Sequence, residues 1–505
     1  LQDRTTAIAD RYSALLRANE VHNSAVLVMD VKSGEVLAYV GNLRTAGTSH
    51  APAVDIVQAR RSTGSLLKPF LYAAMLQEGE LMPDQLVADL PTHYEGFSPK
   101  NFDEGLDGAV PASEALSRSL NIPAVRALRS HGIDRTIRVL RRMGLDHVDR
   151  SADNYGLSLI VGGAESTLWE LTGAYASLAR IVLQHSNDRN SKIPLVHPSI
   201  VNGSEEFNSD QDPVIKAAAA YHTLIALQQL NRPETQQGWQ HFGGEAIAWK
   251  TGTSFGHRDA WAIGVTDRYA VGVWTGNASG EGRPGLTGTL VAAPLLFEIF
   301  GILPNGRGFD PPYDQMTRME VCRHSGHRAS NDCAQVDTMW TISEALRTAP
   351  CPYHQRILVD QQNQVRVVPS AGARSISWFV LPPAMEYYYA QKHPHYRPLP
   401  PWRIGEQPFE NAASMEMIYP ENGAHILIPI KLDGEFGKLV LQAAHRDANA
   451  KLHWDVNGVH HGTTSGDHVF PIDLPVGRHR LTLTDDLGNF LTTTFHVDRA
   501  TLPNP

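Results

Sequence analysis

The sequence predicts a multidomain α+β protein, in which an antiparallel sheet flanked by helices precedes a C-terminal immunoglobulin-like β-sandwich. Three observations predict this arrangement. The chain has 505 residues, 42% of them hydrophobic, which is enough for two or three domain cores. Helical and strand-like patterns are mixed up to about residue 303. After this point the composition changes, and proline and aromatic residues occur in clusters. About seven short alternating strands separated by turns occupy residues 412–497.

These patterns divide the chain into four expected parts. We predict a linker helix at 1–20, a mixed α and β domain at 21–303, a connector packed across another surface at 304–411, and the β-sandwich at 412–505. The net charge of −9 argues against a nucleic-acid partner. No apolar run approaches the roughly 18 residues of a membrane helix, and no signal peptide opens the chain. Because residue 1 already falls in a helical pattern, we expect the chain to start inside a longer protein.

The first chemical motif is Ser65-Leu66-Leu67-Lys68, at the expected start of a helix over residues 66–76. Positions i and i+3 of a helix share a face, so Ser65 and Lys68 should point together. A serine hydroxyl needs a base to become a nucleophile. Lys68 suits that role only if burial and a second ammonium lower its pKa well below about 10.4. The Ser65 N–H at the helix N-terminus would supply half of an oxyanion hole. Alone, the motif also fits a capping serine and an exposed lysine.

The second motif, Ser119-Leu120-Asn121, separates two helical patterns at residues 111–118 and 123–130. A loop there can project Ser119 and Asn121 to the same side. Ser119 would then relay a proton, and the Asn121 amide would hold an amide group of a substrate. Serine and asparagine are also favoured helix caps, so this motif alone is weak.

The third motif, Lys250-Thr251-Gly252-Thr253, ends an apolar run and is followed by two further strand patterns. Three antiparallel strands joined by short turns fit this pattern, with the first as an edge strand lining a cleft. Gly252 would let a substrate backbone lie close, and an extended peptide could pair with the edge. Lys250 is the second ammonium expected near Lys68. With Thr251 and Thr253 it suits a carboxylate, and the Thr253 N–H would complete the oxyanion hole. Taken alone, the K-T-G motif also fits an ordinary strand end.

The ordered set S-x-x-K, S-x-N and K-T-G is the signature of serine acyl transfer in penicillin-binding proteins and class A β-lactamases. Residues of about 20–300 resemble the transpeptidase domain of bifunctional class A penicillin-binding proteins, and most closely their 1C branch. The resemblance is carried by residues 25–30 and 33–41, RSTGSLLKPFLY at 61–72, SRSLNIPAVRAL at 117–128, and KTGTSFGHRDAWAIG at 250–264. The last domain resembles the C-terminal domain that marks this branch.

The resemblance implies a peptidoglycan D,D-transpeptidase that cross-links stem peptides through a serine ester and is acylated by β-lactams. Ser65 would be the nucleophile, Lys68 the base and Ser119 the proton relay. Five residues would bind substrate: Asn121, Lys250, Thr251, Gly252 and Thr253. No cofactor is expected for catalysis. The family's glycosyltransferase motif E-D-x-x-F-x-x-H does not occur, so glycan polymerisation is not expected from this chain.

The resemblance also implies a cellular setting and partners. The full-length protein would be membrane-anchored in the periplasm, attached to the inner membrane of a Gram-negative bacterium. Its partners would be peptidoglycan stem peptides and β-lactams. The C-terminal domain suggests the further hypothesis of a cell-envelope protein partner, against the alternative of a passive brace.

Two other enzymes share the same acylation chemistry, and a scaffold with little turnover is a third alternative. A β-lactamase needs a second base in an E-x-x-x-N element, but Glu165, expected in a helix, is followed four residues later by Trp169. A D,D-carboxypeptidase transfers the acyl group to water, and the sequence leaves the choice of acceptor open. A penicillin-binding scaffold with little turnover would keep Ser65 idle.

The cysteines form a second candidate site. A tetrahedral structural zinc site of the Cys₃His type would use Cys322, Cys333, Cys351 and His354. His324 and His327 lie nearby, so the fourth ligand stays open. The alternative is a Cys322–Cys333 disulfide with Cys351 free, which a periplasmic setting permits. Either role is structural, because the cluster is far in sequence from the serine motifs.

Overall fold

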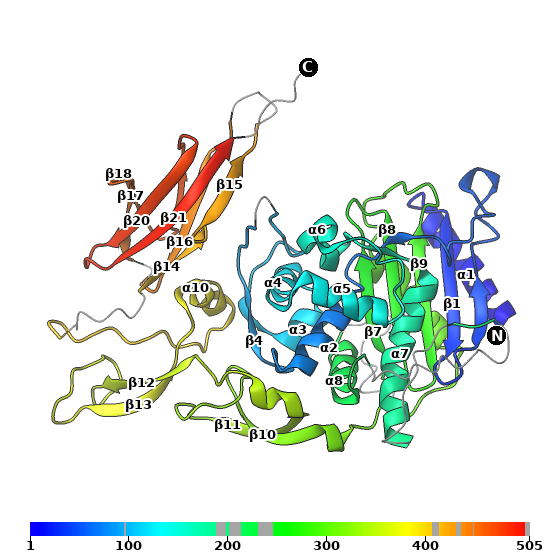
Figure 1. Ribbon diagram of the computed structural model, residues 1–505, viewed down its shortest axis with the longest axis horizontal. Helices are drawn as coiled ribbons and strands as arrows, with labels where there is room; N and C mark the ends of the chain where they lie inside the picture. Colours follow the sequence, from blue (N-terminus) through cyan, green and yellow to red (C-terminus); the bar gives the residue numbers. More distant parts are fainter. Residues whose placement is uncertain are drawn as a thin grey trace.

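The computed structural model describes residues 1–94, 97–187, 198–200, 214–230, 246–406, 414–430, 436–447 and 449–499. Its elements form three parts, which follow one another along the chain (Figure 1). The N-terminal unit runs from α1 (Gln2–Arg17) to α9 (Ala293–Phe300), and the connector runs from β10 (Met316–Cys322) to α10 (Pro383–Lys392). The C-terminal sheets run from β14 (Met415–Tyr419) to β21 (Phe490–Arg499).

A five-stranded antiparallel sheet in the order β2-β1-β9-β8-β7 is the centre of the N-terminal unit. Its strands are β1 (Asn23–Asp30), β2 (Val36–Val40), β7 (Ala248–Thr253), β8 (Asp259–Val265) and β9 (Tyr269–Gly276). Alternate residues of β1 enter two different cores: Leu27 faces one and Val26 the other. Both faces of the sheet are therefore buried, and β7 is left as an edge strand, as expected.

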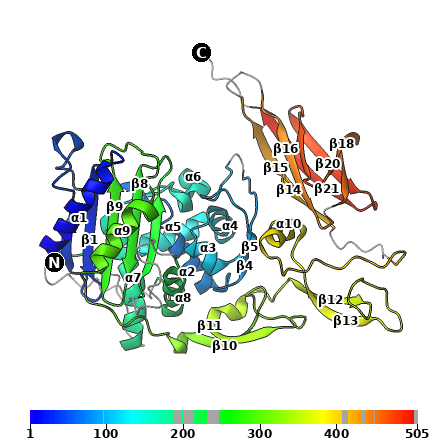
Figure 2. The same ribbon diagram turned by 180° about the vertical axis from the view of Figure 1, so that it is seen from behind.

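Helices cover the two faces of this sheet. On one face lie α1 and α9, and α7 packs on the other, as Figures 1 and 2 show from opposite sides. The remaining helices gather on the α7 side, and short elements complete the unit. The helices are α2 (Lys68–Glu78), α3 (Ala112–Ser117), α4 (Asn121–His131), α5 (Ile133–Arg142), α6 (Ala152–Tyr155), α7 (Leu168–Asn187) and α8 (Ala217–Gln228). The short elements are β3 (Arg61–Ser62), β4 (Leu86–Asp89), β5 (Gly108–Pro111), β6 (Glu165–Ser166), η1 (Thr48–His50), η2 (Gly156–Val161) and η4 (Gly288–Ala292).

Two local expectations were wrong. The helix of the S-x-x-K motif begins at Lys68, and Ser65 lies in the turn of residues 64–67 before it. Pro69 explains the later start, because its missing N–H cannot bond to the Ser65 carbonyl four residues back and its ring would crowd that carbonyl. Glu165, expected in a helix, lies instead in β6, which pairs with β3.

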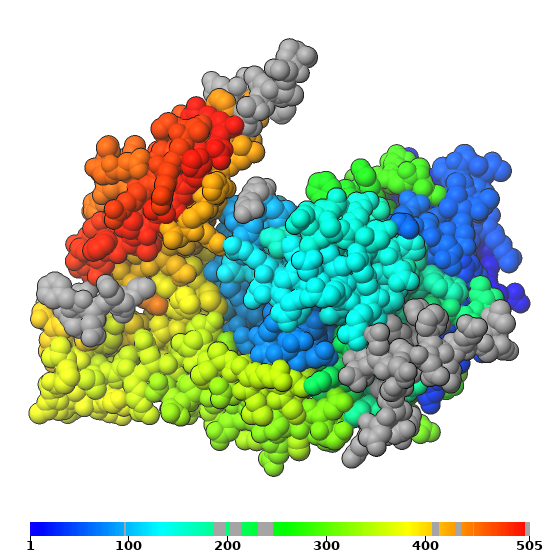
Figure 3. Space-filling view, in the orientation of Figure 1, coloured from blue at the N-terminus to red at the C-terminus, as the bar shows by residue number. Residues whose placement is uncertain are grey.

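The connector runs along one side of the N-terminal unit toward the C-terminal sheets (Figure 3). It contains two β-hairpins and α10, with short η elements between them. The hairpin strands are β10 with β11 (Val336–Ile342), and β12 (His354–Val359) with β13 (Arg374–Phe379); the short elements are η5 (Tyr313–Gln315) and η6 (Ser343–Arg347). Gly326 is pressed against the N-terminal unit: a β-carbon there would lie 1.8 Å from the Asp84 carbonyl oxygen.

The C-terminal sheets enclose their own core, which contains Trp454, Leu441 and Phe495. One sheet has the order β14-β16-β19 and the other the order β15-β21-β20-β17-β18. The remaining strands are β15 (Ala424–Ile428), β16 (Leu439–His445), β17 (Lys451–Val456), β18 (Val459–Ser465), β19 (Val469–Ile472) and β20 (Gly477–Asp485). The predicted fold class, a sheet flanked by helices with a C-terminal β-sandwich, is confirmed. Within the described ranges, none of the helices combines the length and the hydrophobicity that a membrane crossing requires.

Candidate active site

The turn that carries Ser65 lies directly against the edge strand β7. Gly64 has φ 53°, and a β-carbon on it would lie 2.6 Å from the Thr253 backbone nitrogen. A β-carbon on Gly252 would lie 2.7 Å from the Thr63 carbonyl oxygen. Both glycines are therefore needed for the two backbones to touch. The contact brings the partly exposed Ser65 and the K-T-G strand into one site.

Lys68 is buried and directed at the S-x-N segment. Its Nζ donates to the Ser119 carbonyl oxygen at 2.7 Å, to the Leu120 carbonyl oxygen at 3.1 Å and to Asn121 Oδ1 at 2.7 Å. An ammonium has three donors, so these acceptors match its charged form. Burial, and then the nearby charge of Lys250, lower the pKa of Lys68 well below its usual value. A neutral Lys68 would have only two donors, and its lone pair would be free to accept a proton.

Ser119 joins the two lysines of the site. It lies in the loop between α3 and α4 with φ 61°, a left-handed conformation that costs a residue other than glycine about 1–3 kcal/mol. Its hydroxyl accepts a hydrogen bond from Lys250 Nζ at 2.7 Å, and its carbonyl accepts from Lys68. The O–H of Ser119 remains able to donate to a further group.

Lys250 is fully buried on β7, on the side of the sheet that faces Ser65. Burial lowers the pKa of Lys250 to about 7. Its Nζ also donates to the Thr251 carbonyl oxygen at 2.9 Å. Side chains alternate along a strand, so Thr251 and Thr253 face the other side, where Thr253 Oγ1 accepts from the Gly288 N–H at 3.0 Å. The structure thus groups Lys250 and Gly252 with Ser65, and sets the two threonine side chains toward η4.

Asn121 is the first residue of α4, and its carboxamide is already engaged. Its Oδ1 accepts from Lys68, and its Nδ2 donates to the Lys100 carbonyl oxygen at 2.8 Å. One N–H of the amide is left for a substrate. Asn121 therefore fixes the lysine as well as offering a donor.

The sequence reading missed a support behind Asn121. The Asn101 Oδ1 accepts the backbone N–H of Asn121 at 2.9 Å and that of Ile122 at 3.2 Å, which caps α4. The Asn101 Nδ2 in turn donates to Asp89 Oδ1 at 2.8 Å in a buried contact. Asn101 lies 12 residues from Asp89 and 20 residues from Asn121 in the sequence, so no local pattern indicates these contacts.

The cysteine cluster lies in the connector, where Cys322 ends β10 and His354 begins β12. Its four ligand atoms all lie within 4.8 Å of one another: one atom each from Cys322, Cys333, Cys351 and His354. The three cysteines are free. His354 Nδ1 is 3.5 Å from Cys322 Sγ, 3.6 Å from Cys333 Sγ and 3.4 Å from Cys351 Sγ.

These distances fit a single tetrahedral ion. Zn–S bonds of about 2.3 Å and Zn–N bonds of about 2.0–2.1 Å, at a tetrahedral angle, give a sulfur–nitrogen separation of about 3.6 Å. Two donors support the sulfurs: the Ser325 hydroxyl donates to Cys351 Sγ at 3.1 Å, and the Ser330 N–H donates to Cys333 Sγ at 3.3 Å. Of the three histidines that the sequence left open, His354 is the one whose ring nitrogen lies with the three sulfurs, whereas His327 Nδ1 contacts the Ser325 carbonyl oxygen.

Comparison with known proteins gives two family matches. The family described as "Penicillin binding protein transpeptidase domain" matches residues 24–283, and the "Penicillin-Binding Protein C-terminus Family" matches residues 405–495.

Similar proteins come from several bacteria. The chain is 33% identical over 348 residues to penicillin-binding protein 1C of Escherichia coli (strain K12), covering 68% of this chain and 43% of the relative. It is 30% identical over 287 residues to penicillin-binding protein 1A of Neisseria gonorrhoeae, covering 54% of this chain and 34% of the relative. The matched part thus spans less than half the length of either relative. The crystal structure of penicillin-binding protein 1A from Haemophilus influenzae matches with a TM-score of 0.49 and 21% identity, over 65% of this chain and 54% of that chain.

Proposed function

Because this chain belongs to the penicillin-binding protein transpeptidase family, we propose that it is a serine-type peptidoglycan D,D-transpeptidase that β-lactams acylate. The observation that carries the proposal is the convergence of Lys68, Ser119 and Lys250 beside the Ser65 turn, at β7, the edge strand of the described sheet. Two buried lysines linked through one serine are costly to maintain in a fold that does not use them.

Acylation would begin with neutral Lys68 taking the proton of the Ser65 hydroxyl. The Ser65 oxygen then bonds to the carbonyl carbon of the penultimate D-Ala of a stem peptide. The backbone N–H groups of Ser65 and Thr253 would stabilise the oxyanion. As the C–N bond breaks, the leaving D-Ala amine takes a proton from the Ser119 hydroxyl, which Lys68 replaces. Lys250 would hold the terminal carboxylate, and Thr251 and Thr253, whose side chains face η4, would contact the substrate through the backbone of β7. Gly252 would let the substrate backbone lie close, and the free N–H of Asn121 would hold an amide.

Deacylation would reverse these proton transfers with a new amine. The amino group of a neighbouring stem peptide bonds to the ester carbonyl carbon and passes a proton through the Ser119 hydroxyl to Lys68. As the C–O bond to Ser65 breaks, Lys68 returns this proton to the Ser65 oxygen. Water in place of the amine would make the same site a D,D-carboxypeptidase.

Labelling with a fluorescent penicillin, followed by peptide mapping, tests the nucleophile. We expect label on Ser65, none on Ser65→Ala, and normal labelling of Ser279→Ala, an exposed serine outside the site. Label on any other residue would refute the assignment.

A second assay tests the acceptor. The chain is incubated with a pentapeptide donor and an amine acceptor, and we expect both D-Ala and a new amide. D-Ala release without amide product would identify a carboxypeptidase. Stable labelling of Ser65 by penicillin, with no D-Ala release from the pentapeptide, would identify a penicillin-binding scaffold.

We further propose that the full-length protein acts in the periplasm, attached to the inner membrane of a Gram-negative bacterium. Similarity to cell-envelope enzymes of bacteria supports this setting. The C-terminal sheets are proposed to meet a cell-envelope protein partner. Fractionation of cells that produce the full-length protein tests the location, since recovery in the cytoplasmic fraction would contradict it.

The cysteine cluster is proposed to hold a structural zinc ion, supported by the match between its distances and tetrahedral geometry. Zinc would tie β10, the 330–333 turn and β12 into one unit, and it takes no part in the acyl transfer. Metal analysis of the purified chain is expected to give about one zinc per molecule with no disulfide. An intact Cys322–Cys333 disulfide by mass spectrometry, with no metal, would replace this assignment.

A further inference from the structure

The connector helix α10 is sandwiched between the N-terminal unit and the C-terminal sheets (Figure 1). One small core is shared by all three parts of the molecule. It joins Leu86, Leu90 and Ala109 of the N-terminal unit, Leu381, Ala384 and Met385 of the connector, and Ile418 and Ala444 of the C-terminal sheets. The helix is therefore not a spacer, because its removal would open a core on both sides.

Contact between α10 and the N-terminal unit depends on one glycine. Gly108, the first residue of β5, has φ 72°, and a β-carbon on it would lie 2.3 Å from the Met385 carbonyl oxygen and 2.6 Å from the Tyr389 nitrogen. No side chain fits between these backbones. The backbone of α10 thus rests on the strand that follows Asp107.

The C-terminal sheets hold the opposite side of α10. Arg446 forms an ion pair with the buried Glu386 and donates to the Leu381 carbonyl oxygen at 2.8 Å. Glu416 accepts the Ala384 N–H, at the start of the helix, at 3.0 Å. These contacts fix the position of α10 from the side away from the N-terminal unit.

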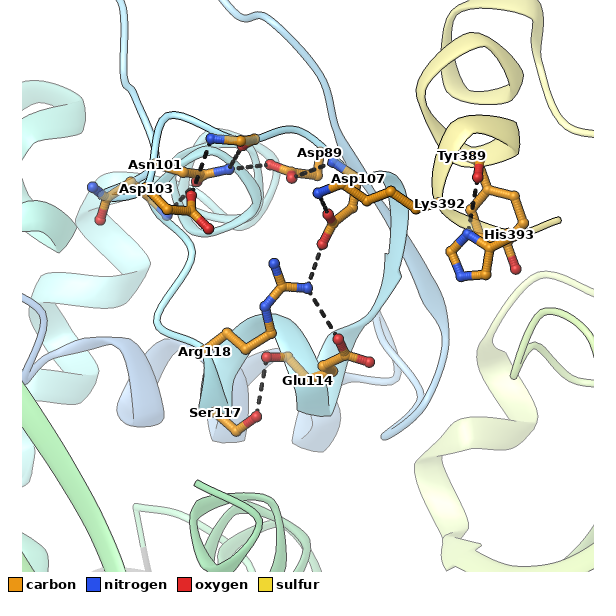
Figure 4. Close-up of polar contacts among 12 residues, drawn as sticks. Asp89, Asn101, Asp103, Asp107, Glu114, Ser117, Arg118, Tyr389, Lys392 and His393 are labelled. Carbon is orange, nitrogen blue, oxygen red and sulfur yellow. Dashed lines mark hydrogen bonds and ion pairs between the residues drawn. The ribbon is translucent and has the colours of Figure 1, made fainter. Parts of the chain in front are cut away.

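Lys392, the last residue of α10, reaches into the N-terminal unit (Figure 4). Its ammonium forms an ion pair with Asp107, whose other carboxylate oxygen pairs with Arg118. The Asp107 side chain is only 7% exposed. Burial by itself would raise the pKa of Asp107, but the hydrogen bonds from Lys392 and Arg118 outweigh it and hold the pKa below its usual value. Asp107 is thus a buried anion shared by two cations.

Asp107 is connected to both ends of the S-x-N loop. On one side, its partner Arg118 directly precedes Ser119 in the chain. On the other side, the Asp107 N–H donates to Asp89 Oδ2 at 2.9 Å, and Asp89 accepts from Asn101, which caps α4 at Asn121. Figure 4 shows this continuous set of contacts running from Lys392 to Asn101.

We propose that Lys392 is a positioning residue of the acylation site, through which the connector and the C-terminal sheets hold the S-x-N loop in place. Lys392 holds the Asp107 carboxylate in position, and Asp107 holds Arg118 next to Ser119. Through Asp89 and Asn101, Asp107 also holds the start of α4. The Ser119 carbonyl and Asn121 Oδ1 thereby stay at the distances that bind Lys68. The proposal rests on the proposed acyl transfer at Ser65.

The test compares the full chain with Lys392→Met, which keeps the length of the side chain and removes its charge. The second-order rate constant for acylation by a fluorescent penicillin is measured across pH. A small displacement of a reacting group costs one to two orders of magnitude in rate, so we expect a loss of about tenfold. The rising limb of the pH profile should also move to lower pH, because Lys68 loses acceptors for its charged form.

Two further variants separate positioning from general stability. Lys392→Arg restores the charge and should recover most of the rate. Lys451→Ala, at an exposed lysine on β17, should acylate as the unchanged chain does. An unchanged rate and pH profile in Lys392→Met would overturn the proposal.

Hydrogen exchange gives a readout that does not depend on acylation. In Lys392→Met the amides of Asn121 and Ile122, which bond to Asn101, should exchange faster than in the unchanged chain, while amides of β8 keep their rates. Equal exchange at Asn121 and Ile122 would overturn the proposal even if no penicillin reacted. Absence of Ser65 labelling in the unchanged chain would instead refute the proposed function.

Discussion

At the scale of single residues, the site is defined by two enclosed lysines with one serine between them. Each ammonium would be costly to bury alone, and two in one site repel each other. The structure offsets this cost with acceptors: two carbonyls and a carboxamide for Lys68, and a hydroxyl and a carbonyl for Lys250. Burial and charge repulsion outweigh these acceptors and lower both pKa values, so the pair loses a proton more readily than lysines in water, as a base next to Ser65 requires.

The lysine pair predicts a bell-shaped pH dependence of acylation. Below the lowered pKa of Lys68 the amine keeps its proton and cannot accept one, so the rate rises with pH through that value. Above the pKa of Lys250, about 7, the ammonium that would hold the substrate carboxylate is lost, so the rate falls. Stopped-flow rates with a carboxylate-bearing penicillin measure this profile, whose apparent pKa values belong to the coupled pair.

Lys250→Arg is the matched variant for the falling limb. A guanidinium keeps its charge over the whole range, so the decline above about pH 7 should disappear. A rate that still climbs from about pH 8 to about pH 10 in the unchanged chain would contradict the assigned role of the Lys250 charge.

Ser119 gives a second prediction at this scale. Ser119→Ala removes the hydroxyl that accepts from Lys250 and is proposed to protonate the leaving amine. Positioned proton transfer contributes about 10²–10⁴-fold to rate, so acylation should fall by about 10²-fold or more. Quenched-flow labelling measures this, with thermal unfolding as the control for folding. A rate within a factor of about three of the unchanged chain would exclude Ser119 as the relay.

The single residues also show how much of the site could be predicted from the sequence. Ser65, Lys68, Ser119 and Lys250 could be found because each lies in a short motif whose spacing reflects its chemistry. Asn101, Asp89 and Asp107 could not, because each acts through a partner that only folding brings near. The roles assigned to the motif residues remain proposals, whereas their proximity is a property of the fold.

At the scale of elements, the decisive feature is the edge strand β7 against the Ser65 turn. Antiparallel pairing of β7, β8 and β9 could be predicted from three apolar runs with short turns. The start of α2 was predicted too early, although Pro69 contained the necessary information: its ring is incompatible with a helical bond to Ser65. The continuous apolar run of β1 indicates a buried strand, but it does not reveal which helices cover the two faces, since α1, α7 and α9 are brought there only by folding.

Gly252 provides the element-scale prediction. Gly252→Ala would place a β-carbon 2.7 Å from the Thr63 carbonyl oxygen, so β7 would have to move away from the turn that carries Ser65. We expect acylation to fall at least tenfold, because a shift of this size misaligns Ser65 and the Thr253 N–H. Gly437→Ala is the control, since its nearest neighbour would lie at an ordinary 3.6 Å. Unchanged acylation in Gly252→Ala, with unchanged melting temperature, would refute this close contact.

At the scale of the whole molecule, the two large parts are joined through α10 rather than through a free linker. The C-terminal β-sandwich could be predicted from its period-two alternation, since each strand buries one set of side chains. The shared core around α10 could not, because its members come from three separate segments, residues 86–109, 381–385 and 418–444, and none of them has a local signature. The density of proline and aromatic residues after residue 304 indicated only that this region packs against something.

The cysteine cluster leads to a prediction about the whole molecule, because its turn is anchored on the N-terminal unit. Gly326 touches Asp84, and the Ser325 carbonyl accepts the Leu86 N–H at 2.8 Å, at the start of β4. If zinc orders this turn, then Cys351→Ser, or a strong chelator, should loosen the connector where it supports β4 and β5. We expect a lower melting temperature, by about 2–4 °C for each kcal/mol lost in a domain of this size, and weaker acylation through α10.

Calorimetry of the full chain with and without chelator measures this effect. Added zinc should restore the melting temperature of the chelated unchanged chain, but not that of Cys351→Ser. His324→Ala is the matched control, because His324 lies beside the cluster without supplying a ligand atom to it. A chelator that leaves both the melting temperature and the acylation rate unchanged would show that the connector holds its shape without a metal. The support of the S-x-N loop would then depend on the α10 core and the Lys392–Asp107 ion pair alone.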